Sequence, residues 1–242
     1  MSTPTRTIKD LVIANRILAM LGVVDAFGDI SARDPQDAGR FLLARPVSPA
    51  SVQPADIIAF GPDGEPARPD NRELPRERFI HAAIYAARPD VHAILHASPE
   101  DLLPFGVTPT PLRAVIGSVG DMGLKVPVWD IAKKFGDKTD LEVSTLEQGR
   151  DLARTLGKAR VVLMRGSGFV AVGRTLNDVV RMSAYVPRNG RAITEATPFG
   201  RIKTISAGES AARLAIDPES NAMRRGWEYW ARAAGCGDLL AD

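Results

Sequence analysis

The chain has 242 residues, of which 45% are hydrophobic and 25% are charged, so it is long enough to fill one sizeable core. Its 31 basic and 29 acidic residues leave a formal net charge of +2. This balance, without long blocks of like charge, argues against nucleic acid and membranes as partners. We expect a single domain over residues 1–242, with a C-terminal helical extension over about 206–242.

The sequence shows neither a targeting segment nor a cysteine pair. Its first residues do not form a charged start followed by an apolar stretch and a cleavage site, and no run approaches the roughly 18 apolar residues of a membrane span. Cys236 is the only cysteine, which excludes an internal disulfide and a Cys-x-x-Cys metal site. We therefore expect a cytoplasmic protein whose thiol has no role.

The first quarter of the chain predicts one helix followed by strands. Thr7 with Asp10 is a typical helix cap, and the apolar stripe that follows stops at Gly22. Three strands are then expected, over residues 27–33, 41–44 and 56–60.

The next segment predicts a helix and a strand that carry candidate catalytic side chains. Pro75 suits the first position of a helix that ends before residues 88–90, and Glu77 and His81 lie one turn apart on it. The apolar run 91–98 then predicts a strand, with His96 near its end. A carboxylate and an imidazole that converge at one sheet edge can build a metal site or a proton-transfer site.

The middle of the chain contains a long irregular stretch and then regular elements. Residues 99–139 are rich in Pro and Gly, and such inserts are often functional. Ser144 with Glu147 predicts the start of a helix. The apolar runs 161–164 and 169–172 predict a hairpin.

Two helices are expected after this hairpin. Thr175 with Asp178 predicts a helix cap, and Pro187 should end or kink the helix. The aromatic segment 223–230 predicts a C-terminal helix that packs on the body of the protein or on a neighbouring subunit. The alternative is a lid that gives aromatic walls to the next subunit's pocket, which would suit a flat, ring-like substrate.

Each candidate residue also has a structural interpretation. His96 has the alternative interpretation of a hydrogen-bonded structural histidine at a sheet edge, and for His81 and His92 a structural role is the better interpretation. Glu77 can pair with a neighbouring arginine or cap a helix, and Asp29 beside glycine is a common turn residue.

The order of several short motifs resembles the class II aldolase/adducin family over about residues 8–205. Pro104-Phe105-Gly106-Val107 and Pro111-Leu112-Arg113 are most similar to its decarboxylase and dehydratase-like branches. The motifs that carry the resemblance are Gly28-Asp29-Ile30-Ser31, Glu77-Arg78-Phe79-Ile80-His81, Arg88-Pro89-Asp90-Val91, His96-Ala97-Ser98, and Arg165-Gly166-Ser167-Gly168 through Val172-Gly173-Arg174-Thr175-Leu176.

The resemblance implies an α/β protein with three layers, α/β/α, around a mainly antiparallel central sheet. It also implies a homotetramer with active sites between subunits, an acid/base glutamate that falls on Glu77, and a divalent metal held by three histidines. Of these three ligands, the first matches His96, whereas Ser98 and Ser167 stand at the other two places. The metal site is therefore expected to be altered.

Two kinds of chemistry remain open at such a site. Glu77 and His96, helped by Asp29, are candidate ligands for a weakly bound divalent ion (Mn, Mg, Zn or Fe). Without a metal, Glu77 would move a proton while His96 or Arg113 stabilises an oxyanion or carboxylate.

The function expected from these residues is that of a lyase. Decarboxylation, retro-aldol cleavage or dehydration of a small carboxylated substrate, with an aromatic ring as one option, would pass through a carbanion or enolate. The candidate catalytic residues are Glu77, His96, Asp29 and Arg113, and the candidate substrate-binding residues are Ser31, Ser98, Ser167 and Gly166. The alternative is a catalytically silent family member that serves in ligand binding or assembly.

Overall fold

A seven-stranded mixed sheet forms the centre of the protein, for which a computed structural model describes residues 3–240. The strand order is β3-β2-β1-β4-β7-β6-β5, and each neighbouring pair is antiparallel except the parallel pair of β5 and β6. The strands are β1 (Asp29–Arg33), β2 (Phe41–Ala44), β3 (Ile57–Phe60), β4 (Ala93–Ala97), β5 (Val128–Trp129), β6 (Val161–Met164) and β7 (Phe169–Gly173). The mainly antiparallel α/β fold is thus confirmed.

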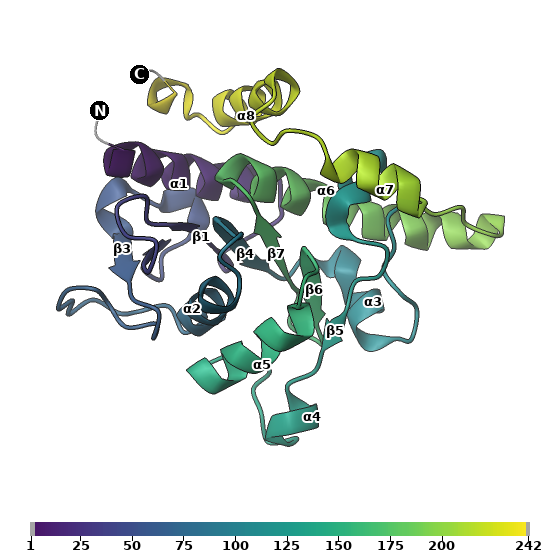
Figure 1. Ribbon diagram of the computed structural model, residues 1–242, viewed down its shortest axis with the longest axis horizontal. Coiled ribbons are helices and arrows are strands. Elements are labelled where there is room, and N and C mark those ends of the chain that lie inside the picture. Colours follow the sequence, from purple (N-terminus) through teal and green to yellow (C-terminus); the bar gives the residue numbers. More distant parts are fainter. Residues whose placement is uncertain (1–2, 241–242) are drawn as a thin grey trace.

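Helices cover both faces of this sheet (Figure 1). On one face lie α1 (Thr3–Met20) and α6 (Leu176–Ala196), and on the other lie α2 (Arg78–Ala87) and α5 (Leu146–Leu156). Strand β4 shows how the sequence divides the core, because side chains alternate across a strand. Leu95 packs in the cluster of α1 and α6, whereas its neighbour Ile94 packs in the cluster of α2 and α5.

Hydrogen-bonded caps define two of these helices. The Thr175 side chain accepts a hydrogen bond from the Asp178 amide at the start of α6, as predicted. The box that starts α5 pairs Thr145 with Gln148, one residue later than the predicted Ser144 and Glu147. The one-residue error arises because Ser, Thr, Gln and Glu are adjacent here and each pair satisfies the same pattern.

Three other helix boundaries differ from the expectations. Helix α1 already includes Thr3, so Thr7 lies inside it and does not cap it. Helix α2 starts at Arg78, because the residues after Pro75 form a turn. Helix α6 continues through Pro187 to Ala196, where packing of its buried face outweighs the hydrogen bond that proline removes.

Short helices and the C-terminal extension complete the chain. The expected extension is present as α7 (Ala207–Leu214) and α8 (Asn221–Ala233). Helix α8 lies over α1 and α6, and its Trp227 and Trp230 are each only 8% exposed. The irregular segment contains α3 (Leu103–Val107) and α4 (Ala132–Phe135). Within residues 3–240, no helix is both long and apolar enough to cross a membrane.

Candidate active site

Strand pairing brings Asp29 and His96 together at one edge of the sheet. Asp29 is the first residue of β1 and lies directly opposite His96, near the end of β4. Gly28 precedes it at φ +102°, and a Cβ on this glycine would approach the His96 carbonyl to 3.2 Å. Glycine therefore lets the chain enter β1 close to β4.

The turn between β6 and β7 reaches the same edge. A Cβ on Gly168 would lie 2.1 Å from the Ala97 carbonyl oxygen, so only glycine allows this close approach. The neighbouring Ser167 carbonyl accepts a hydrogen bond from the Ser98 hydroxyl at 3.3 Å. Both serines of the altered motifs therefore lie beside His96.

Asp29 is a carboxylate held between two imidazoles. Its Oδ1 pairs with His81 Nε2, and its Oδ2 lies 3.6 Å from His96 Nδ1. Burial alone would raise the pKa of Asp29, but the interactions with His81 and then His96 outweigh it and hold the pKa well below its usual value. Asp29 is thus a fixed negative charge.

His96 has an oxygen atom near each of its ring nitrogens. Nδ1 faces Asp29, and Nε2 lies 3.3 Å from the Ser167 carbonyl oxygen. Burial opposes a charged imidazole, but Asp29, and to a smaller extent Glu77 and the carbonyl, raise the pKa of His96. These oxygen atoms favour the imidazolium, although Nδ1 is beyond hydrogen-bond distance of Asp29 and has no hydrogen-bond partner in the described structure.

Glu77 occupies the N-cap position of α2 and lines a pocket with His96. Burial raises the pKa of the Glu77 carboxyl, and the negative charge of Asp29 raises it further, although His96 opposes this shift. Both shifts favour the protonated form, so Glu77 and His96 are two candidate proton donors in one cavity.

The pocket that contains this pair has a volume of about 420 Å³. Of the described residues that line it, His96 is the one basic group, and four carry carboxyl groups. Its lining residues are Gly22, Val23, Val24, Asp25, Phe27, Gly28, Glu77, His96, Ser98, Pro99, Glu100, Glu142 and Ser167. The cavity is therefore acidic around a single cation.

A buried hydrogen-bond chain supports Asp29 from behind. His81 Nδ1 lies 2.6 Å from the Ser31 hydroxyl, which lies 2.9 Å from the Tyr85 hydroxyl. All three side chains are buried. This chain orients His81, which the sequence placed one turn from Glu77. The sequence offered no way to see that Asp29 would meet it.

The structure brings together some of the candidate residues and separates others. Glu77, His96, Ser98 and Ser167 line the same pocket, with Asp29 directly behind His96. Arg113 instead lines a different cavity beside Thr204 and Ile205.

Two candidate substrate-binding residues also lie outside that pocket lining. The Ser31 side chain is fully buried against His81 and Tyr85. Gly166 provides the turn at φ +71°, and its Cα faces Leu141. Their roles in substrate binding remain predictions.

The residues present do not fit the three-histidine metal site that the resemblance implies. Within residues 3–240, no three His, Cys, Asp or Glu side chains form a group able to hold a metal ion. Serine hydroxyls at positions 98 and 167 are poor ligands for zinc-like ions. In addition, the raised pKa of His96 favours the imidazolium, which has no lone pair to offer.

Comparison with known proteins identifies the family. The family described as Class II Aldolase and Adducin N-terminal domain matches residues 9–191, and this chain belongs to it. The decarboxylase tropJ of Talaromyces stipitatus is 29% identical over all of this chain and 97% of its own length. A 3,4-dihydroxyphthalate decarboxylase of Arthrobacter keyseri is 25% identical over 73% of each chain.

Solved structures show the same fold. An aldolase II superfamily protein from Pseudomonas syringae superimposes with a TM-score of 0.78 at 19% identity, covering 97% of this chain and 94% of its own. An L-fuculose 1-phosphate aldolase gives a TM-score of 0.73 at 18% identity, covering 88% and 96%. At these identities the likeness concerns the fold alone.

Proposed function

We propose that this protein is a decarboxylase that acts on a small aromatic carboxylate. The names of the relatives similar in sequence support the reaction class. The observation that carries the proposal is that Glu77 and His96 line one pocket in environments that favour their protonated forms. This combination suits decarboxylation of a ring, because the ring carbon needs a proton donor and the ring oxygen that gains negative charge needs a hydrogen-bond donor.

In the proposed reaction, Glu77 donates its proton to the ring carbon that bears the carboxylate, while a ring hydroxyl in the ortho or para position loses its proton to water, which leaves a non-aromatic ring with a carbonyl oxygen. The bond between this carbon and the carboxylate then breaks and CO2 leaves. The electron pair restores the aromatic ring, so negative charge develops on the ring oxygen, where an N–H of His96 stabilises it. The Ser167 carbonyl is a distant partner for His96 Nε2 at 3.3 Å, so this N–H can turn to a substrate oxygen. The ring oxygen and Glu77 then each take up a proton from water.

The charge of the pocket limits the number of anionic groups that the substrate can carry. Asp25, Glu77, Glu100 and Glu142 line it together with a single imidazole. A second anionic group on the substrate would meet carboxylates rather than a counter-charge. The proposed substrate therefore carries one carboxylate on a ring whose other substituents, such as hydroxyl groups, are neutral.

The predicted homo-oligomer, a tetramer, belongs to the same proposal. Because Arg113 does not line the pocket of its own chain, its predicted role requires that it reach the pocket of a neighbouring copy. Sedimentation velocity on the purified protein would measure the assembly. A monomer that is fully active would exclude a shared site.

Turnover of hydroxylated aromatic monocarboxylates, followed by CO2 release, tests the proposed function. Glu77→Gln should lower kcat by a factor of about 100 or more, because it removes the proton donor. Glu73→Gln is the matched control, since Glu73 is exposed and does not line the pocket. Equal turnover in both variants would refute the role of Glu77. Ligand binding without turnover across the panel would favour the catalytically silent alternative.

A further inference from the structure

A second pocket adjoins the C-terminal end of α1, as the candidate active site does. It has a volume of about 750 Å³ and is lined by residues of α1, α6, α7 and α8. Met20 and Leu21 line it, whereas the next residues, Gly22 and Val23, line the pocket of Glu77. The two cavities are therefore separate but adjoin one short segment.

The charged residues that line this second pocket are all positive. Arg181, Arg188, Arg213 and Arg225 line it, and none of its described lining residues is acidic. Within residues 3–240, Arg188, Arg213 and Arg225 have no ion-pair partner, whereas Arg181 pairs with two buried aspartates. The three guanidinium groups of Arg188, Arg213 and Arg225, which no carboxylate neutralises, create a positive potential that attracts an anion.

Two of these arginines also have buried donor atoms that remain unsatisfied. The Nε atoms of Arg181 and Arg213 are buried and have no hydrogen-bond partner in the described structure. Arg181 is only 6% exposed, so water reaches little of it. Buried donors normally have an acceptor. Their lack of one within the chain points to an acceptor supplied by a ligand.

Aromatic rings form the remaining wall of this pocket. Tyr185 and Trp230 lie 6.1 Å apart between ring centroids, and the Arg188 guanidinium lies 5.1 Å from the Tyr185 ring. Tyr229 also lines the pocket and is 69% exposed. Such rings present flat apolar surfaces against which a planar group packs.

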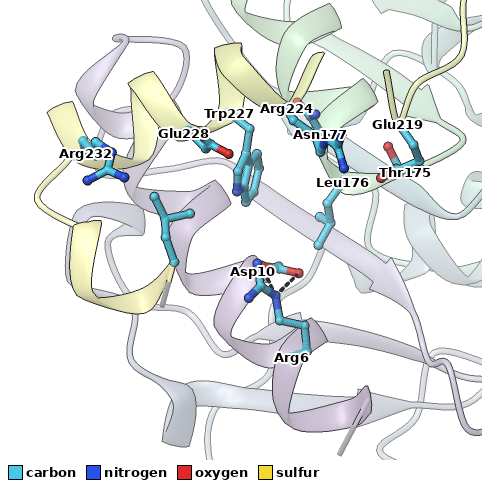
Figure 2. Close-up of a pocket in the computed structure, with 11 residues that line it drawn as sticks. Arg6, Asp10, Thr175, Leu176, Asn177, Glu219, Arg224, Trp227, Glu228 and Arg232 are labelled. Carbon is cyan, nitrogen blue, oxygen red and sulfur yellow. Dashed lines mark hydrogen bonds and ion pairs between the residues drawn. The ribbon is translucent and has the colours of Figure 1, made fainter. Parts of the chain in front are cut away.

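The other side of α8 differs in charge (Figure 2). There Arg224 and Trp227 line a third cavity in which the acidic Asp10, Glu219 and Glu228 accompany the arginines. The one-sided positive charge is thus specific to the face of α8 that carries Arg225 and Trp230.

We propose that the cavity of Arg181, Arg188, Arg213 and Arg225 is a second binding site, for a small planar aromatic carboxylate. The guanidinium fork matches the geometry of a carboxylate, and the aromatic wall matches a ring. This inference goes beyond the proposed reaction and does not depend on it, because no residue of the Glu77 pocket takes part.

Isothermal titration calorimetry with 2-naphthoate tests this proposal on the full chain, with the neutral 2-naphthamide as the comparison ligand. Naphthoate should bind and naphthamide should bind far more weakly. The double variant Arg188→Gln/Arg225→Gln should weaken naphthoate binding by about tenfold or more, through the loss of charged hydrogen bonds. Both arginines are exposed, so the fold should persist. Arg224→Gln is the matched control, because its side chain lines the other cavity.

Three results would overturn the proposal. The first is equal affinity for naphthoate and naphthamide, or no binding of either. The second is naphthoate binding that Glu77→Gln abolishes and the arginine variants leave unchanged, which would place the ligand in the first pocket. The third is a change of oligomeric state in the double variant, measured by sedimentation velocity, which would make this surface an interface between copies of the chain.

Discussion

Replacing Asp29 by Asn should lower the pKa of His96. Oδ2 of Asp29 lies 3.6 Å from Nδ1 of His96, and both side chains are largely buried at 13% and 11% exposure. Two unit charges at this distance interact by about 4–5 kcal/mol at an effective dielectric constant of about 20. Because one pKa unit corresponds to about 1.4 kcal/mol, this interaction sets an upper limit of about 3 units, and we expect the pKa of His96 to fall by about 1–3 units.

Nuclear magnetic resonance is a direct assay because the chain has only 3 histidines. Ring signals of His81, His92 and His96 would be followed between pH 5 and 9, and the exposed His92 would be assigned by His92→Gln. Asp25→Asn is the matched control, since Asp25 borders the same pocket but forms no ion pair with a histidine in the described structure. A His96 signal that titrates identically in both variants would refute the ion-pair argument.

The same interaction sets the sign of a stability effect. The pKa of His96 is raised in the folded protein, so the folded state binds the proton more tightly than the unfolded state. This contribution to the free energy of unfolding is fully present below the unfolded pKa of about 6.5 and is lost as the pH rises through the folded pKa. Urea unfolding at pH 6 and pH 8.5 should show this loss in the wild type and a smaller one in Asp29→Asn.

Two further substitutions test the geometry of the sheet edge. The double variant Ser98→His/Ser167→His should bind Zn²⁺ more tightly by orders of magnitude, because both side chains lie beside His96. Chelator competition measures this affinity. An unchanged affinity would mean that positions 96, 98 and 167 do not converge on one point. Gly168→Ala should lower the free energy of unfolding by about 2–5 kcal/mol, because alanine disfavours the positive φ and its Cβ would contact the Ala97 carbonyl. Gly235→Ala is the control: it has a similar φ but open space around it, so it should lower the free energy of unfolding by only about 1–2 kcal/mol. Equal urea midpoints for the two variants would contradict the contact with Ala97.

Local patterns predicted much of this fold because neighbouring residues determine the elements concerned. The hairpin around residues 165–168 and the cap at Thr175 depend on glycine conformation and on a side chain three residues away from its amide. The edge strand β5 was not predicted, since its two residues become a strand only through pairing with β6. Helix α2 starts at Arg78 and not at Pro75, because residues 76 and 77 form a turn that the proline pattern does not predict.

The candidate site was predicted in part for the same reason. Glu77 and His96 were identified from their chemistry and their place near the ends of elements, and the structure places both in one pocket. The bridging position of Asp29 between His81 and His96 arises from the register of β1 with β4 and from the docking of α2, neither of which a local pattern encodes. The sequence therefore indicated only a structural role for His81. In the structure its ion pair with Asp29 lowers the pKa of that carboxyl.

Metal binding and proton binding compete for the same nitrogen atoms of His96. A metal ion requires a neutral imidazole with a free lone pair, whereas Asp29 and the Ser167 carbonyl favour the doubly protonated ring. We therefore expect Mn²⁺ or Zn²⁺ to bind the wild type weakly, and still more weakly at pH 6 than at pH 8.5. Thermal shift with each ion, combined with elemental analysis of the purified protein, measures both. Tight stoichiometric metal at pH 6 would show that His96 is not held as the imidazolium, and the acid role proposed for it would fail.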